Sequence, residues 1–347
     1  MVRCQDIADI AGVSRQAVSA VLNGRGTAAV SAQTRDRILK IARELNYQPN
    51  ESARSLARGC SRTVAFPYSP DTVLKLMRSP VYPRLIASLS THFARKGYGF
   101  TLFPVEDIDN ASQKLQMILS GRFDGIVCHV FYQKEELELF EKYKSRVVFF
   151  ATTTALDATF ADARIDGEPG IAELAEHFRC QGHTKIAYVG HKKDEKRLLQ
   201  HLKIFSDCGV PISDKYIITG GNYRGNPGDS LVCFEETRKN WDILRQCTAV
   251  VFNNDYYALG GCSALRQLGA VPGRDIAVAG HDNLEECCEP FLTTTTAPYE
   301  ILGERCVERL CAQLAGEEIF PAEKISNRLI IRQSTADFSY SEKKENE

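Results

Sequence analysis

Apolar side chains recur at helical spacing in short segments at the start of the chain. The first segment, Ile7–Ala11, is interrupted by Gly12, and Ser14 is a favourable N-cap for a second helix that turns Val18 and Val21 inward. Two short helices joined at a glycine are typical of a helix-turn-helix. An ordinary helical hairpin with a solvated polar face has the same pattern, so this stretch alone leaves both interpretations open.

A third helix is predicted after Ser31, which is another capping residue. Its apolar positions from Ile38 to Leu45 follow helical spacing, so the three helices can enclose one small core, onto which Tyr47 also folds back. The next segment, residues 49–59, predicts one more short helix. At about eight residues that helix is too short to be stable alone, which suits a segment that folds on contact with DNA.

Beyond Arg62 the pattern changes to short apolar runs that alternate with amphipathic segments. Such alternation predicts strands connected by helices in a doubly wound parallel sheet. The pattern occurs twice in succession, which predicts two lobes with a ligand crevice at the carboxyl ends of their strands. The predicted strands are Thr63–Phe66, Phe100–Phe103, Gly125–His129, Val147–Phe150, Ile186–Val189, Ala249–Phe252 and Ile276–Ala279, and the main helices are Tyr82–Lys96, Ala111–Ser120, Ile171–Gln181 and Ala258–Leu268.

The composition is that of a soluble protein with two or three domains. Of the 347 residues 44% are hydrophobic and 25% are charged, and no run of about 18 apolar residues predicts a transmembrane helix. Because the first residues lack the apolar core of a signal peptide, we expect a cytoplasmic protein. Twelve cysteines are scattered without any C-x-x-C pair, which favours buried free thiols over a metal site or a disulfide framework.

The net charge of −1 hides an uneven distribution. Residues 1–62 contain ten basic and five acidic side chains, a net +5, so the rest of the chain carries −6. A small basic module on a larger acidic body is the charge distribution of a DNA reader joined to another domain. On the predicted second helix, Arg15 and Gln16 lie beside the small residues Ala17 and Ala20, a combination that suits a helix pressed into the DNA major groove.

These segments together resemble the DNA-binding headpiece of the LacI/GalR family, the lactose- and purine-repressor type of bacterial transcription regulator. The matching residues are Ile7-Ala8, Ala11-Gly12-Val13-Ser14, Val18-Ser19, Val21-Leu22-Asn23, Val30-Ser31, Thr34-Arg35, Leu45-Asn46-Tyr47 and Pro49-Asn50. The resemblance implies a headpiece at residues 1–48 and a hinge helix with its linker at 49–61. The DNA contacts that we expect are Ser14, Arg15, Gln16, Ala17, Ser19, Ala20, Asn23, Arg25, Ser31, Asn50, Arg54, Leu56 and Arg58.

Leu56 stands where that family places a hinge-helix leucine, which enters the minor groove at the centre of the operator. An apolar wedge of this kind unstacks a base step and bends the DNA, which allows a wider contact. A linker leucine that packs against the body is the alternative for this position.

The body resembles the same family over nearly its whole length, with a fold related to periplasmic sugar-binding proteins. The matching stretches include Arg164-Ile165-Asp166, residues 182–190, Asn254-Asp255, residues 280–283 and residues 332–335. The resemblance implies a two-lobed effector-binding and dimerisation domain at residues 62–340, followed by a charged tail at 341–347. We expect crossings between the lobes near Arg164, Ala297 and Ala322, so that lobe 1 comprises residues 62–164 and 297–322 and lobe 2 comprises 165–296 and 323–340.

The resemblance points to Arg197 and Asp282 as contacts to a small effector. A guanidinium offers paired donors and a carboxylate offers paired acceptors, so together they can chelate adjacent sugar hydroxyls. A surface salt bridge or a loop residue is the alternative for each position in the pocket. The effector-binding residues that we expect are Ser69, His129, Arg197, Tyr223, Asn254 and Asp282.

The chain departs from the family around this pocket. Gln200 and His201 stand where a glycine and an aromatic residue usually follow the arginine, and His281 replaces the aromatic residue before Asp282. Residues 71–79 and 224–229 look like insertions. Effector specificity therefore cannot be carried over from a relative, although a mono- or disaccharide is the favoured class.

The sequence thus predicts an all-α helix-turn-helix headpiece and an α/β body of two doubly wound parallel-sheet lobes, working as a homodimeric repressor. Two headpieces would bind a pseudo-palindromic DNA operator under the control of a carbohydrate effector, without cofactor, metal or membrane, and a tail without leucine heptads favours a dimer over a tetramer. A transport component would share the body but needs export. An enzyme is disfavoured, because the chain has no nucleophile elbow, phosphate loop or G-x-G-x-x-G after a strand.

Overall fold

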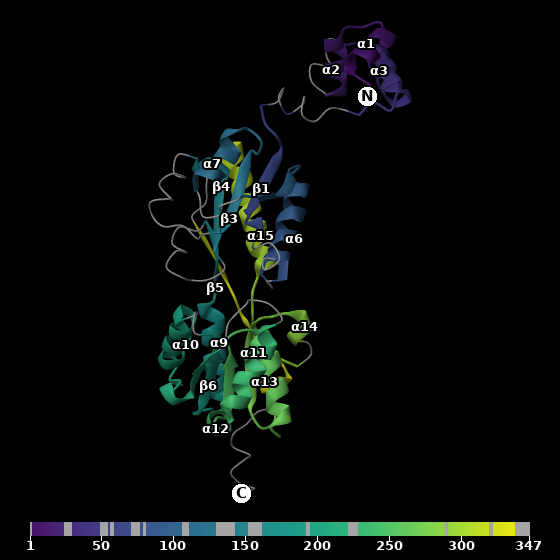
Figure 1. Cartoon of the computed structure of the whole chain (residues 1–347). Coiled ribbons are helices and arrows are strands. Elements are labelled where there is room, and N and C mark those ends of the chain that lie inside the picture. Colours follow the sequence, from purple (N-terminus) through teal and green to yellow (C-terminus); the bar gives the residue numbers. More distant parts are fainter. Residues whose placement is uncertain are drawn as a thin grey trace. The chain divides into compact units, whose positions relative to one another are not determined.

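The computed structural model describes residues 2–23, 30–48, 55, 59–70, 77–78, 81–105, 111–129, 143–151, 162–191, 195–220, 228–288, 291–318 and 322–336. The chain forms two compact units, Met1–Ser61 and Arg62–Glu347, and each is described by itself (Figure 1). None of the helices within these ranges combines the length and the apolar character that a membrane crossing requires.

The first unit is a domain of three helices whose ends are fixed by local caps. As predicted, the Ser14 and Ser31 hydroxyls accept hydrogen bonds from backbone amides in the first turns of the second and third helices, at 3.1 and 3.2 Å. Gly12 follows the first helix with a φ of 60°, a left-handed conformation that glycine adopts without steric cost. The helices are α1 (Cys4–Ala11), α2 (Arg15–Leu22) and α3 (Ala32–Glu44).

These three helices enclose one apolar core. Ile7, Val18 and Ile38 come from different helices, and all three side chains are fully buried. Tyr47 packs against the same core as predicted, with its hydroxyl 3.0 Å from the Cys4 sulfur. Local caps and one shared core therefore define the headpiece, and they orient the outer face of α2.

The second unit contains two sheets, and in the first of them all neighbouring strands run parallel (Figure 1). Helices α6 (Val81–Arg95) and α15 (Tyr299–Ala315) pack on one face, and α7 (Ala111–Leu119) packs on the other. The short turn η3 (Lys144–Arg146) precedes the fourth strand. In spatial order the strands are β11 (Glu323–Ser326), β5 (Ala163–Asp166), β4 (Val147–Ala151), β3 (Gly125–His129), β1 (Thr63–Tyr68) and β2 (Gly99–Pro104).

The second sheet is parallel except for one edge strand, β12, which runs antiparallel to its neighbour. In spatial order its strands are β12 (Leu329–Ile330), β10 (Thr293–Thr296), β9 (Ala277–Asp282), β8 (Ala249–Phe252), β6 (Ile186–Gly190) and β7 (Ile217–Thr219). One face carries α9 (Glu168–Cys180) and α10 (Glu195–Asp207), and the other carries α11 (Asp229–Lys239), α12 (Trp241–Leu244) and α13 (Asp255–Gln267). Shorter helices are η5 (Asp214–Tyr216), α14 (Glu285–Cys288) and α16 (Gln333–Ala336).

The predicted architecture of two doubly wound parallel-sheet lobes is confirmed, and each of the seven predicted strands overlaps an observed one. Two predicted crossings come too early, by two residues near Arg164 and by four near Ala322. Strand β5 continues to Asp166 in the first sheet, and β11 pairs with β5, so residues 323–326 belong to lobe 1 rather than to lobe 2. The physical reason is burial, because Ile325 lies in the core of the first lobe. The crossings therefore follow Asp166 and Ser326 instead of Arg164 and Ala322.

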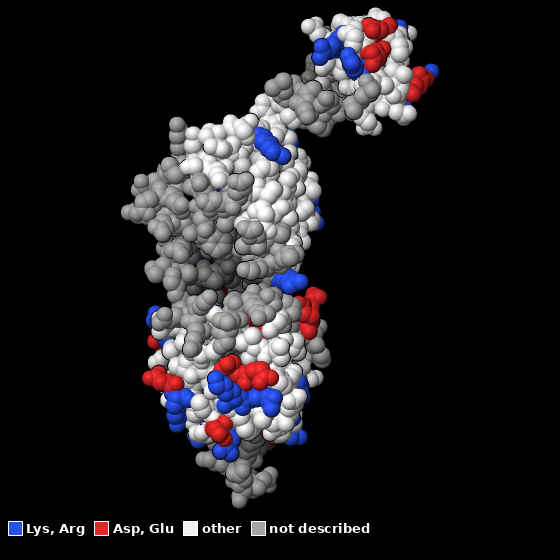
Figure 2. All heavy atoms as spheres, in the orientation of Figure 1, with Lys and Arg blue, Asp and Glu red and all other residues white. Residues whose placement is uncertain are grey.

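Ten cysteines within the described residues are free thiols. Cys128, Cys233, Cys262 and Cys306 are buried as expected, whereas Cys180 is exposed. The same part of the chain contains no cluster of three or more His, Cys, Asp or Glu side chains that could bind a metal ion. On the visible face of the second lobe, acidic and basic side chains are interspersed, which is typical of an ordinary solvated surface (Figure 2).

Ile38→Ala should selectively destabilise the headpiece. Removing a fully buried isoleucine leaves a cavity in a small core, and we expect a loss of about 2–5 kcal/mol in the free energy of unfolding of this unit. Hydrogen exchange of the α1 and α2 amides in the full chain measures the effect. The control is Ile10→Ala, because that isoleucine is 60% exposed and should contribute less than about 0.5 kcal/mol. Equal protection in the two variants would contradict the assigned core.

Candidate functional site

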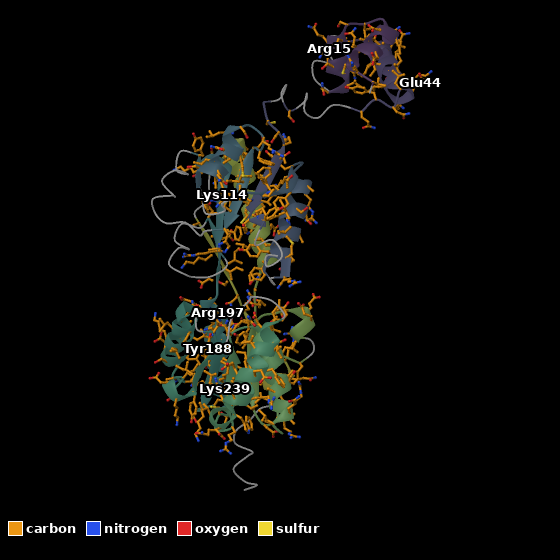
Figure 3. All side chains as sticks on the ribbon, in the orientation of Figure 1. Arg15, Glu44, Lys114, Tyr188, Arg197 and Lys239 are labelled. Atoms are coloured by element: carbon orange, nitrogen blue, oxygen red, sulfur yellow. The ribbon has the colours of Figure 1, made fainter. Side chains whose placement is uncertain are left out.

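The outer face of α2 carries the side chains that the sequence assigned to DNA contact. Arg15 and Gln16 are exposed, and Ala17, Ser19 and Ala20 are half-buried beside them. Figure 3 labels Arg15 on this unit. Because the opposite face of the helix is held in the three-helix core, the first turn presents two long polar side chains next to small ones. This shape and chemistry match what a base-reading helix needs.

Three other predicted contacts have local partners. Ser14 and Ser31 are exposed while they cap α2 and α3, and Asn23 donates from its side-chain amide to the Ser19 hydroxyl at 3.1 Å. The first backbone amides of a helix also form a favourable site for a phosphate. The remaining predicted contacts, Arg25, Asn50, Arg54, Leu56 and Arg58, lie outside the described residues.

In the second unit, polar side chains gather at the carboxyl edge of the second sheet. His191 directly follows β6, Asn253 and Asn254 follow β8, and His281 and Asp282 end β9. The first four of these residues are buried almost completely. Because the strands are parallel and adjacent, their carboxyl ends meet at one edge, which is where open α/β sheets bind ligands.

Helix α10 brings Arg197 to this edge. Its Nη2 atom lies 3.8 Å from Oδ1 of Asp282, and the two side chains are 27% and 14% exposed. Figure 3 shows Arg197 near the end of the second lobe, with Tyr188 of β6 deeper inside it. The distance between Arg197 Nη2 and Asp282 Oδ1 is longer than a hydrogen bond, so a polar ligand can place its own hydroxyls against both charged groups.

The backbone that presents Asp282 is strained. Asp282 and Asn283 have φ values of 101° and 49°, in a region that non-glycine residues seldom occupy unless their surroundings hold them there. Here three side chains do so. Arg84 donates to the Asp282 carbonyl at 3.3 Å, Arg332 donates to the Asn283 side-chain oxygen at 2.8 Å, and the Asp255 carboxylate accepts the amide that follows the turn at 2.9 Å.

Arg84 connects the two lobes at this turn. It belongs to α6 of the first lobe, and its guanidinium also donates to both carboxylate oxygens of Glu300, at 2.7 and 3.1 Å. Glu300 lies in the first turn of α15, just after the chain crosses back from β10. A cavity of about 520 Å³ opens beside these contacts, and its lining includes Arg78 from the first lobe and Tyr256 from the second. Its described lining contains none of the predicted effector residues.

His201 and His281, the two histidines that depart from the family pattern that the sequence resembles, are in direct contact. His201 Nε2 lies 2.8 Å from His281 Nε2, His201 Nδ1 lies 2.7 Å from the Arg197 carbonyl, and His281 Nδ1 lies 2.8 Å from the Thr295 hydroxyl. Burial, together with the nearby positive charge of Arg197, lowers the pKa of His201 to about 3. Burial, the neighbouring His201 and Arg197 also hold the pKa of His281 well below its usual value. Both rings are therefore neutral near pH 7.

The predicted residues of the first lobe lie at the ends of neighbouring strands. Ser69 follows β1 and is buried, and His129 ends β3, with its ring centroid 4.8 Å from that of Phe150 and 6.3 Å from that of Tyr82. Burial raises the pKa of Tyr82 to about 12. Tyr223 lies outside the described residues.

Asn254 has a local structural partner. Its side-chain oxygen caps α13 by accepting the Tyr257 amide at 2.9 Å, and the residue is 1% exposed. The tertiary structure thus brings Arg197 and Asp282 together, whereas Asn254 secures the start of a helix that follows the same sheet edge.

The sequence missed several residues that shape this site. The change of residue type at positions 201 and 281 was a detectable signal, but nothing in the sequence indicated that these two histidines touch. Arg84 is 198 positions away from the carbonyl that it contacts, and Arg332 is 49 positions away from Asn283. No local pattern identifies such partners, because the folded lobes bring them together.

Comparisons with known proteins agree with this division of the chain. Residues 4–50 match the family model for bacterial regulatory proteins of the lacI family, and residues 175–335 match the model for a periplasmic binding protein-like domain. The HTH-type transcriptional repressor PurR of Vibrio vulnificus (strain CMCP6) is 29% identical over 327 residues, which cover 92% of this chain and 93% of that protein.

Two solved structures share the fold. The lac repressor dimer bound to operator and the anti-inducer ONPF has a TM-score of 0.77 at 24% identity, covering 96% of this chain and 99% of that one. A complex of the transcriptional regulator CelR with cellobiose has a TM-score of 0.62 at 22% identity, covering 96% of this chain and 100% of that one.

Acidification should destabilise the second unit through His201 and His281. An unfolded histidine binds a proton with a pKa of about 6.5, whereas these two stay neutral to much lower pH when folded. The unfolded state therefore takes up more protons, and the free energy of unfolding falls as the pH falls from about 6.5 towards 3, by up to about 1.4 kcal/mol per pH unit for each histidine.

Urea unfolding of the full chain between pH 7.5 and 5 measures this slope. Replacing both residues, as His201→Phe with His281→Phe, should make the slope shallower. The comparison variant His92→Gln removes a half-buried histidine from α6 of the first lobe, outside this pair. An unchanged slope in the double variant would show that other groups cause the acid sensitivity.

Proposed function

Because the chain is a LacI-type transcription regulator, a lacI-family headpiece joined to a periplasmic-binding-protein-like body, we propose that an effector held by Arg197 and Asp282 controls its affinity for an operator. The observation that carries this proposal is the position of the Arg197–Asp282 pair. It lies at the carboxyl edge of a parallel sheet, next to a strained turn that the other lobe contacts through Arg84. The proposal assigns no catalytic step to any residue.

DNA recognition is assigned to the headpiece. Arg15 and Gln16 would read base edges in the major groove, with Ala17, Ser19 and Ala20 allowing the close approach. Phosphate contacts from Ser14, Asn23, Arg25 and Ser31 would fix the register without selecting the sequence. Asn50, Arg54, Leu56 and Arg58 would form the hinge contact, in which Leu56 enters the minor groove.

A carbohydrate is the proposed effector class. The guanidinium of Arg197 supplies donors and the carboxylate of Asp282 supplies acceptors, a pair that suits vicinal hydroxyls. The structural relative with bound cellobiose supports this class. Ser69, His129, Asn254 and Tyr223 are the proposed further contacts.

Arg84 is the proposed connection between the effector and the lobe arrangement. An effector that engages the Asp282 carboxylate acts on the same residue whose carbonyl accepts a hydrogen bond from the first lobe. A change at the strained turn would therefore shift the contact between α6 and the second lobe. Such a shift counts as allostery only if operator and effector each distinguish the two arrangements.

The working unit is proposed to be a homodimer in the cytoplasm. Two headpieces match a pseudo-palindromic operator, because the twofold symmetry of the protein then coincides with that of the DNA. The structural relative solved as a dimer on its operator supports this assembly.

Arg15→Ala should relax operator preference. If Arg15 grips a guanine, its loss should cost about 1–3 kcal/mol for the preferred sequence, with a much smaller effect on unrelated DNA. Selection of preferred sites from random duplexes, followed by anisotropy titration at fixed salt, measures both quantities. Arg37→Ala is the matched control, since it removes the same charge from an exposed position on α3. Unchanged site preference in Arg15→Ala would exclude this residue from base reading.

Asp282→Asn should weaken effector binding at least tenfold, because it removes half of the charged pair with little change of size. A thermal-shift screen of sugars and nucleosides identifies the ligand, since a ligand at 100 times its Kd stabilises its protein by about 2.7 kcal/mol. The control Asp242→Asn alters a carboxylate that is 88% exposed on α12. The chain truncated to residues 62–347 should keep the shift and lose operator binding. Retention of operator binding by that truncated chain would overturn the proposal.

A further inference from the structure

The contact between His201 and His281 allows only one arrangement of protons. A backbone carbonyl can only accept, so the 2.7 Å contact with the Arg197 carbonyl requires a proton on Nδ1 of His201. In the neutral ring, Nε2 of His201 is then an acceptor. The facing Nε2 of His281, 2.8 Å away, must donate, and Nδ1 of His281 must accept from the Thr295 hydroxyl. The two buried rings are therefore opposite tautomers in one directional chain.

This chain of hydrogen bonds joins two parts of the structure that the proposed function needs to coordinate. One end is the backbone of Arg197 on α10. The other end is Thr295 of β10, which pairs in register with His281 and leads directly into the crossing to α15. Because His281 also immediately precedes Asp282, the pair touches the backbone of both charged residues of the pocket.

The surroundings keep the rings in place. Each histidine is at most 1% exposed, and their ring centroids are 4.8 Å apart with an interplanar angle of 75°. Tyr188 of β6 and Phe205 of α10 pack against His201, with ring centroids 5.2 and 6.4 Å away. Protonation of His201 would set two N–H donors against each other, and protonation of His281 would place a second buried positive charge near the Arg197 guanidinium, so the charged forms are disfavoured near neutral pH.

We propose that His201 and His281 are positioning residues. Their hydrogen-bonded contact, fixed in one pair of tautomers, holds Arg197 and Asp282 in place relative to β10 and the crossing that follows it. The inference rests on the proposed function only for the statement that these two residues bind an effector. The contact between the two histidines does not depend on a bound ligand. A buried polar pair with every donor and acceptor matched specifies one geometry, since any other leaves a polar group unpaired.

Nitrogen NMR of the effector-free protein tests the tautomers. The chain contains seven histidines, so selective ¹⁵N labelling yields few signals, and each can be assigned by substitution. At pH 7 the long-range ¹H–¹⁵N spectrum should show His201 protonated at Nδ1 and His281 protonated at Nε2, and both should stay neutral down to pH 5. The same tautomer on both residues, or a charged ring at pH 7, would overturn the proposal.

Three variants test positioning against simple burial. His281→Phe removes the donor to His201 and leaves a buried acceptor unpaired, which should raise the unfolding equilibrium constant roughly 10- to 100-fold. His281→Gln keeps an N–H donor and should recover most of that loss. The matched control His183→Phe places the same side chain at another buried histidine of this lobe. His183 lies just before β6, and its Nδ1 contacts the Thr248 hydroxyl.

The readout specific to positioning is the Nε–Hε signal of Arg197, identified by its loss in Arg197→Lys. It should shift in His281→Phe, return towards the wild-type position in His281→Gln and stay unchanged in His183→Phe. An unshifted Arg197 signal in His281→Phe would reduce the pair to a core contact and overturn the proposal. These measurements use no effector, so they succeed or fail independently of the carbohydrate assignment.

Discussion

The second unit depends on pairing the polar groups that lie at the carboxyl edge of its sheet. His191 follows β6 there, Asn253 and Asn254 follow β8, and His281 and Asp282 end β9. Most of these side chains are buried. A buried polar atom without a partner costs more than a hydrogen bond gains, so most of these groups are paired, although Nδ2 of Asn253 has no partner among the described residues. His281 is matched by His201 and Thr295, and Asn254 by the start of α13. These partners come from separate elements, and satisfying them fixes how helices and strands meet.

The pairing of polar groups also makes the turn at the end of β9 a point of contact between the lobes. Asp282 and Asn283 have left-handed backbone conformations, which persist because Arg84, Arg332 and Asp255 hold the turn. Of these three, Arg84 belongs to the first lobe, where Glu300 orients its guanidinium. In the proposed function, a ligand at the Asp282 carboxylate and a movement of the lobes would therefore act on the same residue. The headpiece uses a simpler arrangement, in which one apolar core fixes α2 and leaves Arg15 and Gln16 exposed.

Local signals carried most of the successful predictions. Ser14 and Ser31 cap helices where their positions before apolar periodic segments indicated, because a cap involves residues only three positions apart. The long central strands were visible as apolar runs, since both of their faces are buried. Short edge strands such as β11 carry little pattern of their own. Ile325 joins the core of the first lobe through contacts with residues distant in the sequence, and for this reason the third crossing was misplaced.

The sequence by itself determined the class of the protein: a capped helix-turn-helix with outward Arg15 and Gln16, followed by two α/β lobes. These features reside in spacing, capping and residue type, which act over a few positions. Only the tertiary structure decided which distant groups meet. His201 touches His281 across 80 positions, and Arg84 reaches the Asp282 carbonyl across 198. Pairing of this kind is set by how the sheet and its helices pack in three dimensions, and no one-dimensional pattern encodes it.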